Sequence, residues 1–354
     1  MSKLTRPIGG VILAVGLLVT GCSGSGGGSG AKGAASAGKG GSAVSVENCD
    51  GQKVTFKAPP AKIVTSNASA LEILLRLGAG AKVVGTGFPP GKGALPGGLA
   101  TEAAKVPVLG RTAIAKERLL GSGADTYVET FRPTRGASLT PTPEEYRAAG
   151  IQVVQMRTTA CAAQRSGPRK DLSDVTDDIE RLGTLTGTSK RAGEITASMK
   201  KKVEAVRARI GKVPDERRPT YFVFDYDGGT QQPTAVCGKQ VANAVITLAG
   251  ASNIFRTCDS DYQRVGWEQV VGKNPDWIQL AVRNRGGGAN DAKAFADAEH
   301  FLKTFPATKG LKAVKENKFL RIRSEKITTP GVGNADAVEQ IAHTLYPDRF
   351  EGGQ

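Results

Sequence analysis

Arginine and aromatic side chains stand at or near the ends of several apolar segments that are typical of buried strands. In an open α/β sheet the carboxyl ends of parallel strands meet at one edge, and ligands bind in the crevice there. Guanidinium groups suit anionic or oxygen-rich ligands, and aromatic rings suit the organic frame of a ligand. We therefore predict a ligand-binding site from eight residues: Phe88, Arg111, Phe131, Arg132, Arg157, Tyr226, Tyr262 and Arg283.

Two nine-residue stretches, Glu117–Asp125 and Glu268–Asp276, share one pattern although they start 151 residues apart. In each, a Glu precedes two aliphatic residues, Gly stands four places after the Glu, and Asp stands eight places after it. A second pair, "LGAGAK" and "LAGASN", precedes them in the same order in each half. Two matches in one order favour an internal duplication of two similar lobes over chance.

A bare metal ion and an enzyme active site are both poorly supported. A receptor for bare zinc or manganese needs several His or carboxylate ligands, and His300 and His343 are the only histidines. The segment "GTGFPPG" begins like a dinucleotide-binding loop, but Pro90 stands where the third Gly belongs. No G-x-S-x-G nucleophile motif exists. An exported α/β enzyme and a purely adhesive lipoprotein remain the alternatives to a binding protein, and no metal site is expected.

The elements that must position these residues alternate between strand and helix, which predicts an α/β fold with parallel sheets. The alternation stops between 171 and 211, where the pattern is helical throughout. Within it, residues 189–211 carry one apolar stripe, which predicts a helix about 23 residues and roughly 34 Å long. We expect an N-terminal lobe over 44–170, a helical segment with an interlobe helix over 171–212, and a C-terminal lobe over 213–354.

The N-terminus has the order of a bacterial lipoprotein leader. Lys3 and Arg6 precede an apolar run over 8–19, which is too short for a comfortable membrane span. The run ends in "LVTGC", which resembles a lipobox, so we expect a signal peptide over 1–21 and lipidation of Cys22. The alternative is an ordinary signal peptide with an incidental Cys. Residues 22–43 are rich in Gly, Ser and Ala, which is typical of a flexible tether. The protein is thus expected to be lipid-anchored at the extracytoplasmic face of the cell membrane.

The chain is strongly basic, with a formal net charge of +15 that falls to +13 if Lys3 and Arg6 leave with the leader. No basic cluster with interleaved aromatics appears, so nucleic acid is not an expected partner. We interpret most of the charge as a solvated surface, and part of it as attraction for an anionic ligand.

Taken together, several segments resemble substrate-binding lipoproteins of the ABC importers for ferric siderophores, cobalamin and haem. The resemblance covers 44–350, and the supporting segments are "AKIVTSNASALEILLRLGAGAKVVGTG", "VPVLG", "KERLLGSGADTYV", "NAVITLAGASNIF", "VGWEQVVGKNPDWIQL" and "LKAVKENKFLRI". It implies two Rossmann-like lobes with mostly parallel sheets, joined by a long interdomain α-helix. "TSNASALEIL" departs from the Ser-Pro and Thr-Glu motifs that are usual in the family at this place. This departure affects the expected local ligand contacts and not the expected fold.

The resemblance also implies a function. The expected ligand is a ferric siderophore in the cleft between the lobes, with cobalamin second and haem third. Iron would enter only inside the bound chelate, and no other cofactor or catalysis is expected. By position, Glu117 and Glu268 would dock onto Arg residues of a permease dimer that works with its ATPase subunits. The alternative is that both carboxylates only stabilise helix N-termini.

Four cysteines remain after Cys22: Cys49, Cys161, Cys237 and Cys258. An even number in an oxidising compartment predicts two disulfides, for which three pairings exist. We favour Cys49 with Cys161 and Cys237 with Cys258, because each pair then lies within one proposed lobe. Zinc ligation is the alternative, but no C-x-x-C spacing exists.

Overall fold

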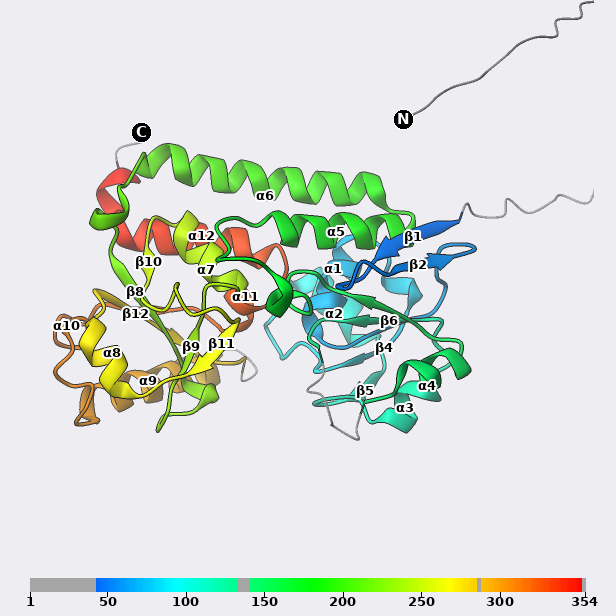
Figure 1. Cartoon of the computed structure of the whole chain (residues 1–354), viewed down its shortest axis with the longest axis horizontal. Helices are drawn as coiled ribbons and strands as arrows, with labels where there is room; N and C mark the ends of the chain where they lie inside the picture. Colours follow the sequence, from blue (N-terminus) through cyan, green and yellow to red (C-terminus); the bar gives the residue numbers. More distant parts are fainter. Residues whose placement is uncertain (1–42, 133–139, 285–287, 352–354) are drawn as a thin grey trace, which may run out of the picture. The chain divides into compact units, whose positions relative to one another are not determined.

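Two separate parallel sheets, one from each half of the chain, form the framework of the protein (Figure 1). The computed structural model describes residues 43–132, 140–284 and 288–351. The expected signal peptide, the lipidated Cys22 and all but the last residue of the tether lie outside the described residues. The α/β fold class is confirmed, and the two sheets are not joined into one.

The sheet of the N-terminal lobe has five parallel strands in the order β5-β4-β3-β6-β7. An antiparallel hairpin of β1 and β2 precedes it. A helix follows most strands, and α1 begins where the Asn67 side chain accepts hydrogen bonds from Ser69 N and Ala70 N. The elements are β1 (Val44–Glu47), β2 (Lys53–Phe56), β3 (Ile63–Thr65), α1 (Ala68–Arg76), β4 (Val83–Gly87), α2 (Gly97–Ala104), β5 (Val108–Gly110), α3 (Lys116–Leu120), β6 (Thr126–Glu129), α4 (Pro143–Ala148) and β7 (Gln152–Gln155).

The sheet of the C-terminal lobe has four parallel strands in the order β10-β8-β12-β13. A separate antiparallel pair of β9 and β11 was not expected, because each strand is only three residues long and shows no clear alternation. The elements are β8 (Thr220–Asp225), β9 (Thr234–Val236), α7 (Val241–Leu248), β10 (Ser252–Asn253), β11 (Tyr262–Arg264), α8 (Trp267–Lys273), β12 (Trp277–Ala281), α9 (Gly288–Thr304), α10 (Lys312–Lys315), β13 (Phe319–Arg321), α11 (Glu325–Thr328) and α12 (Gly333–Leu345).

Two helices connect the lobes, α5 (Ser173–Thr186) and α6 (Ser189–Ile210). They are separated at Gly187, whose φ of 76° is a left-handed conformation that glycine adopts without strain. The 22 residues of α6 extend for about 33 Å. Figure 1 shows α6 running alongside α5 and α12, and it packs on both. Arg191 Nε of α6 also donates to Arg76 O of α1 at 3.2 Å, so α6 contacts elements of both lobes. The expected interlobe helix is therefore present.

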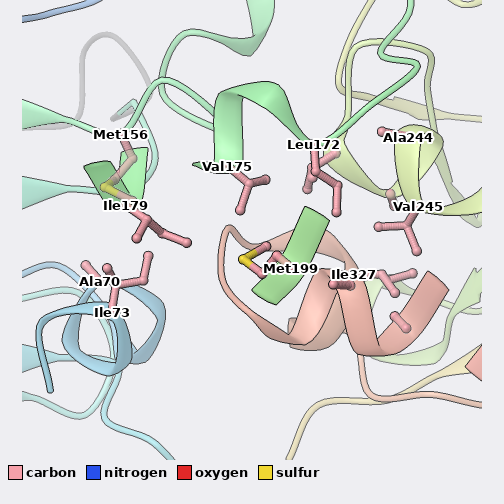
Figure 2. Close-up of a cluster of buried hydrophobic side chains, with 14 of the residues drawn as sticks. Ala70, Ile73, Met156, Leu172, Val175, Ile179, Met199, Ala244, Val245 and Ile327 are labelled. Carbon is pink, nitrogen blue, oxygen red and sulfur yellow. The ribbon is translucent and has the colours of Figure 1, made fainter. Parts of the chain in front are cut away.

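One apolar core cluster extends through both lobes. Figure 2 shows part of this cluster, to which α1 contributes Ile73, α5 Val175, α6 Met199, α7 Val245 and α11 Ile327. All five side chains are less than 5% exposed. The lobes are thus joined by buried side chains as well as by covalent connections.

A buried arginine makes a second junction between the lobes. Arg169 is 2% exposed, and its Nη2 donates to Thr158 O of the N-terminal lobe at 2.5 Å. Its Nε donates to Lys239 O of the C-terminal lobe at 2.6 Å, and its charge is paired with Asp174. One guanidinium therefore satisfies backbone groups from both lobes.

Both favoured disulfides are present. Cys49 is bonded to Cys161, 112 residues away, and Cys237 to Cys258, 21 residues away. Each bond lies within one lobe, which is the ground on which this pairing is favoured. Within residues 43–132, 140–284 and 288–351, no helix combines the length and apolarity needed to cross a bilayer.

Candidate ligand-binding site

The repeated Glu and Asp pattern occupies equivalent positions in the two lobes. Asp125 Oδ2 accepts from Lys62 N at 3.1 Å, immediately before β3. Asp276 Oδ2 accepts from Thr220 N at 2.8 Å, at the start of β8. Because β6 pairs with β3 and β12 pairs with β8, each Asp ties the start of its own strand to that of its neighbour. The Asp that both copies of the pattern contain therefore has a structural role in each lobe.

The Glu end of the pattern is different. Glu117 is the second residue of α3, and Glu268 is the second residue of α8. Both are exposed, and neither forms an ion pair with a residue that the structure describes. A carboxylate in the first turn of a helix is favoured by the helix dipole. Both carboxylates are available for an external cation.

A cavity of about 1370 Å³ lies between the lobes. Its lining includes the ends of strands from both sheets, together with the loop over 88–96 that follows β4. This is the position that open α/β sheets provide for ligands. The elements α1 and α12 also contribute to its wall, through Arg76 and Gln340 respectively.

The structure brings five of the eight predicted ligand-binding residues into the cavity lining: Phe88, Arg111, Phe131, Tyr262 and Arg283. The other three lie elsewhere. Arg157 forms ion pairs with Glu47 at 2.9 Å and with Asp177 at 3.3 Å. Tyr226 packs edge-on against Phe224, with ring centroids 6.0 Å apart. Arg132 lies near the buried Glu129 carboxylate rather than in the lining.

Several lining residues were missed by the sequence analysis. Arg323 follows β13 as Arg283 follows β12, so the same strand-end rule could have found it. Ser324, which is 6% exposed, is the next residue, and its Oγ has no hydrogen-bond partner in the described part of the chain. Arg76 lies within α1, and Arg264 ends the short antiparallel strand β11, which the sequence does not predict, so the strand-end rule could find neither.

The N-terminal wall of the cavity carries two exposed aromatic rings. Phe88 is 48% exposed and Phe131 is 41% exposed. The strand order β5-β4-β3-β6 places Arg111, Phe88 and Phe131 along one edge of the sheet, because they follow β5, β4 and β6. This edge of the sheet therefore combines two apolar rings with the cation of Arg111.

The C-terminal wall is charged. Burial raises the pKa of Asp225, and the nearby charge of Arg283 partly offsets that rise. The backbone N–H of Arg283 donates to Asp227 Oδ2 at 2.7 Å. Arg323 Nε pairs with Asp291 Oδ2, also at 2.7 Å. The carboxyl ends of β8, β12 and β13 thus supply both signs of charge.

Three contacts cross between the walls. Arg323 Nη1 donates to Gly93 O at 3.2 Å, and Ser69 Oγ donates to Pro330 O at 2.6 Å. Gly91 lies against Asn284, where an added Cβ would be 2.1 Å from Oδ1. A side chain at position 91 would therefore force the Asn284 side chain to move. The loop over 88–96 therefore reaches the opposite lobe and encloses one side of the cavity.

Basic side chains outnumber acidic ones in the lining, seven to five. Arg76, Arg321 and Arg323 have carboxylate partners. Among the described residues, Arg111, Arg264 and Lys326 form no ion pair. Unpaired cations in a partly enclosed site favour an anionic ligand.

Comparison with known proteins agrees with this architecture. A family model described as "Periplasmic binding protein" matches residues 63–326. The chain is 23% identical over 318 residues to an uncharacterized ABC transporter substrate-binding lipoprotein, YvrC, of Bacillus subtilis, and the match covers 87% of each chain. It is 25% identical over 250 residues to a cobalamin-binding protein of Halobacterium salinarum, covering 68% of this chain and 58% of that protein.

Solved structures have the same fold. The crystal structure of an ABC-type Fe3+-hydroxamate transport system from Saccharomonospora viridis superposes with a TM-score of 0.69 at 24% sequence identity. The match covers 85% of this chain and 98% of that one. The family match spans both sheets and the helices that join them, so the chain belongs to the periplasmic binding protein family.

Proposed function

We propose that this chain is the extracytoplasmic substrate-binding protein of an ABC importer and that it carries a ferric siderophore in the cavity between its lobes. The main support is the cavity itself, which has a surplus of basic side chains and a volume of about 1370 Å³. Sites for drug-sized ligands have roughly 300–1,000 Å³, so this space suits a large chelate. Unpaired guanidinium groups suit the anionic oxygens of such a chelate. Iron is then cargo inside the chelate, not a resident cofactor.

Cobalamin is the second candidate, because the Halobacterium salinarum relative is named a cobalamin-binding protein. Cobalamin is also a large ligand. The two candidates differ in charge, since cyanocobalamin is neutral overall whereas many ferric siderophores are anionic. A preference for anionic ligands would favour the siderophore.

The deciding experiment is isothermal titration calorimetry of the purified protein against ferric enterobactin, ferrichrome, cyanocobalamin and haemin. Quenching of Trp267 and Trp277 fluorescence gives an independent signal. We expect saturable one-to-one binding of at least one ferric siderophore in the micromolar range or tighter. No binding of either siderophore, with tight binding of cyanocobalamin, would replace the proposal with its alternative.

Docking to a permease is the second part of the proposal, and it rests on Glu117 and Glu268. Each is exposed in the first turn of an equivalent helix, one in each lobe. An Arg–carboxylate pair at each position would fix both lobes against a symmetric permease dimer.

Charge reversal tests this docking. The variant Glu117→Arg/Glu268→Arg should bind ligand normally and reduce uptake in cells by roughly a hundredfold, since a like charge opposes each pair. The matched control is Glu204→Arg/Glu216→Arg, which reverses two exposed carboxylates elsewhere. Normal uptake by the first variant would remove the docking role and leave the two Glu residues as helix-stabilising groups.

Anchoring at the membrane is the third part, and it rests on Cys22 in the "LVTGC" segment. Lipid chains contribute about 0.8 kcal/mol per buried methylene, so two chains hold a protein firmly. The variant Cys22→Ala should move from the membrane fraction to the medium or the periplasm. Retention in the membrane fraction would exclude this anchor without affecting the ligand assignment.

A further inference from the structure

Two of the most exposed large apolar side chains face the cavity. Four large apolar side chains are exposed in the described part of the chain, and Phe88 and Phe131 are two of them. A phenyl ring left in water forgoes the stabilisation that its burial would provide. Exposed apolar groups gathered at one place mark an interaction site more often than scattered ones do. The position of these two rings in the cavity lining therefore points to a bound apolar surface.

Phe88 is also held in a strained backbone conformation. Its φ is 34°, a region that a residue with a bulky side chain rarely occupies. Its N–H donates to Thr112 O at 3.1 Å, and its carbonyl accepts from Ala68 N at 3.0 Å. The neighbouring segments thus fix the backbone on both sides. Strain that the surroundings maintain in this way is typical of a functional position.

Arg111 supplies a cation next to these rings. It immediately precedes Thr112, the residue that binds the Phe88 backbone, and its side chain forms no ion pair with a described residue. Neighbouring strands lie about 4.8 Å apart, so the ends of β5 and β6 are separated by roughly 14 Å. Arg111, Phe88 and Phe131 together form a row of that length, which we call the aromatic shelf.

We propose that the aromatic shelf selects a chelate whose iron-binding groups are aromatic and anionic, such as catecholates or phenolates. This inference rests on the proposed function and narrows its ligand class. The rings of Phe88 and Phe131 stack against aryl donors, and the Arg111 guanidinium pairs with their oxygens. An aliphatic hydroxamate offers no ring for stacking, and its ferric complex is neutral around the metal. The charged C-terminal wall contacts the opposite side of the ligand.

The test compares ferric enterobactin, a catecholate, with ferrichrome, an aliphatic hydroxamate, by calorimetry. Wild-type protein should bind ferric enterobactin at least tenfold more tightly. Phe88→Leu and Phe131→Leu keep an apolar side chain and remove only the ring, so each should weaken ferric enterobactin by about tenfold and ferrichrome by less than twofold. Arg111→Gln should also weaken ferric enterobactin selectively. Val271→Ala, which trims an exposed apolar side chain outside the cavity lining, is the control and should change neither affinity.

Four results would overturn the inference. Equal affinity of the wild-type protein for both chelates would remove the selectivity, and equal losses for both chelates in the Leu variants would remove the role of stacking. Binding of ferrichrome alone would keep the siderophore function and exclude an aromatic ligand. Binding of haemin or cyanocobalamin alone would overturn both this inference and the siderophore assignment. Melting curves of each variant exclude misfolding as the cause.

Discussion

The two lobes have the same frame and different cavity walls. In each lobe an Asp eight residues after an exposed Glu ties two parallel strands together, and the hydrogen bonds of Asp125 and Asp276 are equivalent. The rims differ, because the N-terminal wall has Phe88 and Phe131 while the C-terminal wall has Arg283 and charged neighbours. In both lobes, an Asp carboxylate that accepts from a backbone N–H preserves the pairing of the two strands. Strand-end loops can diverge, since they contact the cavity rather than the core.

The interiors of the lobes differ as well. Counting from Glu117 and Glu268, the buried Glu129 of β6 corresponds to the buried Leu280 of β12. Gln155 Nε2 donates to Glu129 Oε2 at 2.9 Å, and burial raises the pKa of this carboxyl. The N-terminal lobe therefore holds a titratable group where the C-terminal lobe holds an aliphatic one.

Removing the disulfides separately should produce the largest difference between the lobes. Loss of Cys49–Cys161 frees a loop of 112 residues, and loss of Cys237–Cys258 frees one of 21. In the chain-entropy model the first costs about 4 to 5 kcal/mol of unfolding free energy and the second about 3 kcal/mol. Denaturant unfolding of the paired Cys→Ala variants measures both. A larger loss for the C-terminal pair would mean that local packing, not loop length, sets the cost.

Truncation of the arginine between the lobes should have a comparable effect. Arg169→Met leaves the buried carbonyls of Thr158 and Lys239 without a donor and removes one of the two arginines that pair with Asp174, so we expect a loss of about 3 kcal/mol. Arg165→Met is the control, because Arg165 also pairs with Asp174 but is 33% exposed. It should cost less than about 1 kcal/mol. Equal costs in urea unfolding would show that Arg169 does not join the lobes.

Replacing the buried Glu of the N-terminal lobe should stabilise the protein in a pH-dependent way. The folded-state pKa of Glu129 is raised by burial, so ionisation costs stability above its ordinary value of about 4.3, and the cost is absent at lower pH. Glu129→Gln should therefore raise the unfolding free energy at pH 8 by about 1 kcal/mol and leave it nearly unchanged at pH 4.

Glu145→Gln provides a control of opposite sign. The Lys116 ammonium and the backbone of Thr142 hold the pKa of Glu145 below its usual range. Its stabilisation is present above the unfolded pKa and lost as the pH falls, so this variant should be destabilised at pH 8 and less so at pH 4. If the unfolding free energies of both variants changed with pH in the same direction, the opposite pKa shifts of Glu129 and Glu145 would be contradicted.

The smallest expected effect is the release of strain on the cavity wall. Phe88→Asn replaces a strained aromatic residue with one that tolerates positive φ. The free energy of unfolding should therefore rise by about 0.5 to 1 kcal/mol, as measured by denaturant unfolding. Phe131→Asn is the control, since Phe131 has no positive φ to relieve. If both variants change stability alike, the backbone of Phe88 carries no strain.

Regular features of the fold could be predicted from the sequence. The apolar stripe of α6 spans several turns, and its predicted span of 189–211 agrees closely with the observed Ser189–Ile210. Shorter elements could not be found this way. The strands β9 and β11 are stabilised by pairing with each other, and three residues contain too little periodicity to predict them.

The site could be predicted only in part, because a residue at a strand end lines the cavity only if no side chain from elsewhere in the chain pairs with it first. Phe88 and Arg283 follow strands whose ends face the cavity. Arg157 also follows a strand, but Glu47 of the hairpin and Asp177 of α5 approach it from distant parts of the chain. Such long-range ion pairs depend on tertiary structure and leave no trace in local spacing.

The continuous apolar core described above links folding to ligand binding. Side chains of both lobes form one apolar core, so the two lobes should unfold together in a single calorimetric peak. A bound ligand should raise that single melting temperature. Wide separation of the two halves would expose this apolar interior to water and would therefore cost stability.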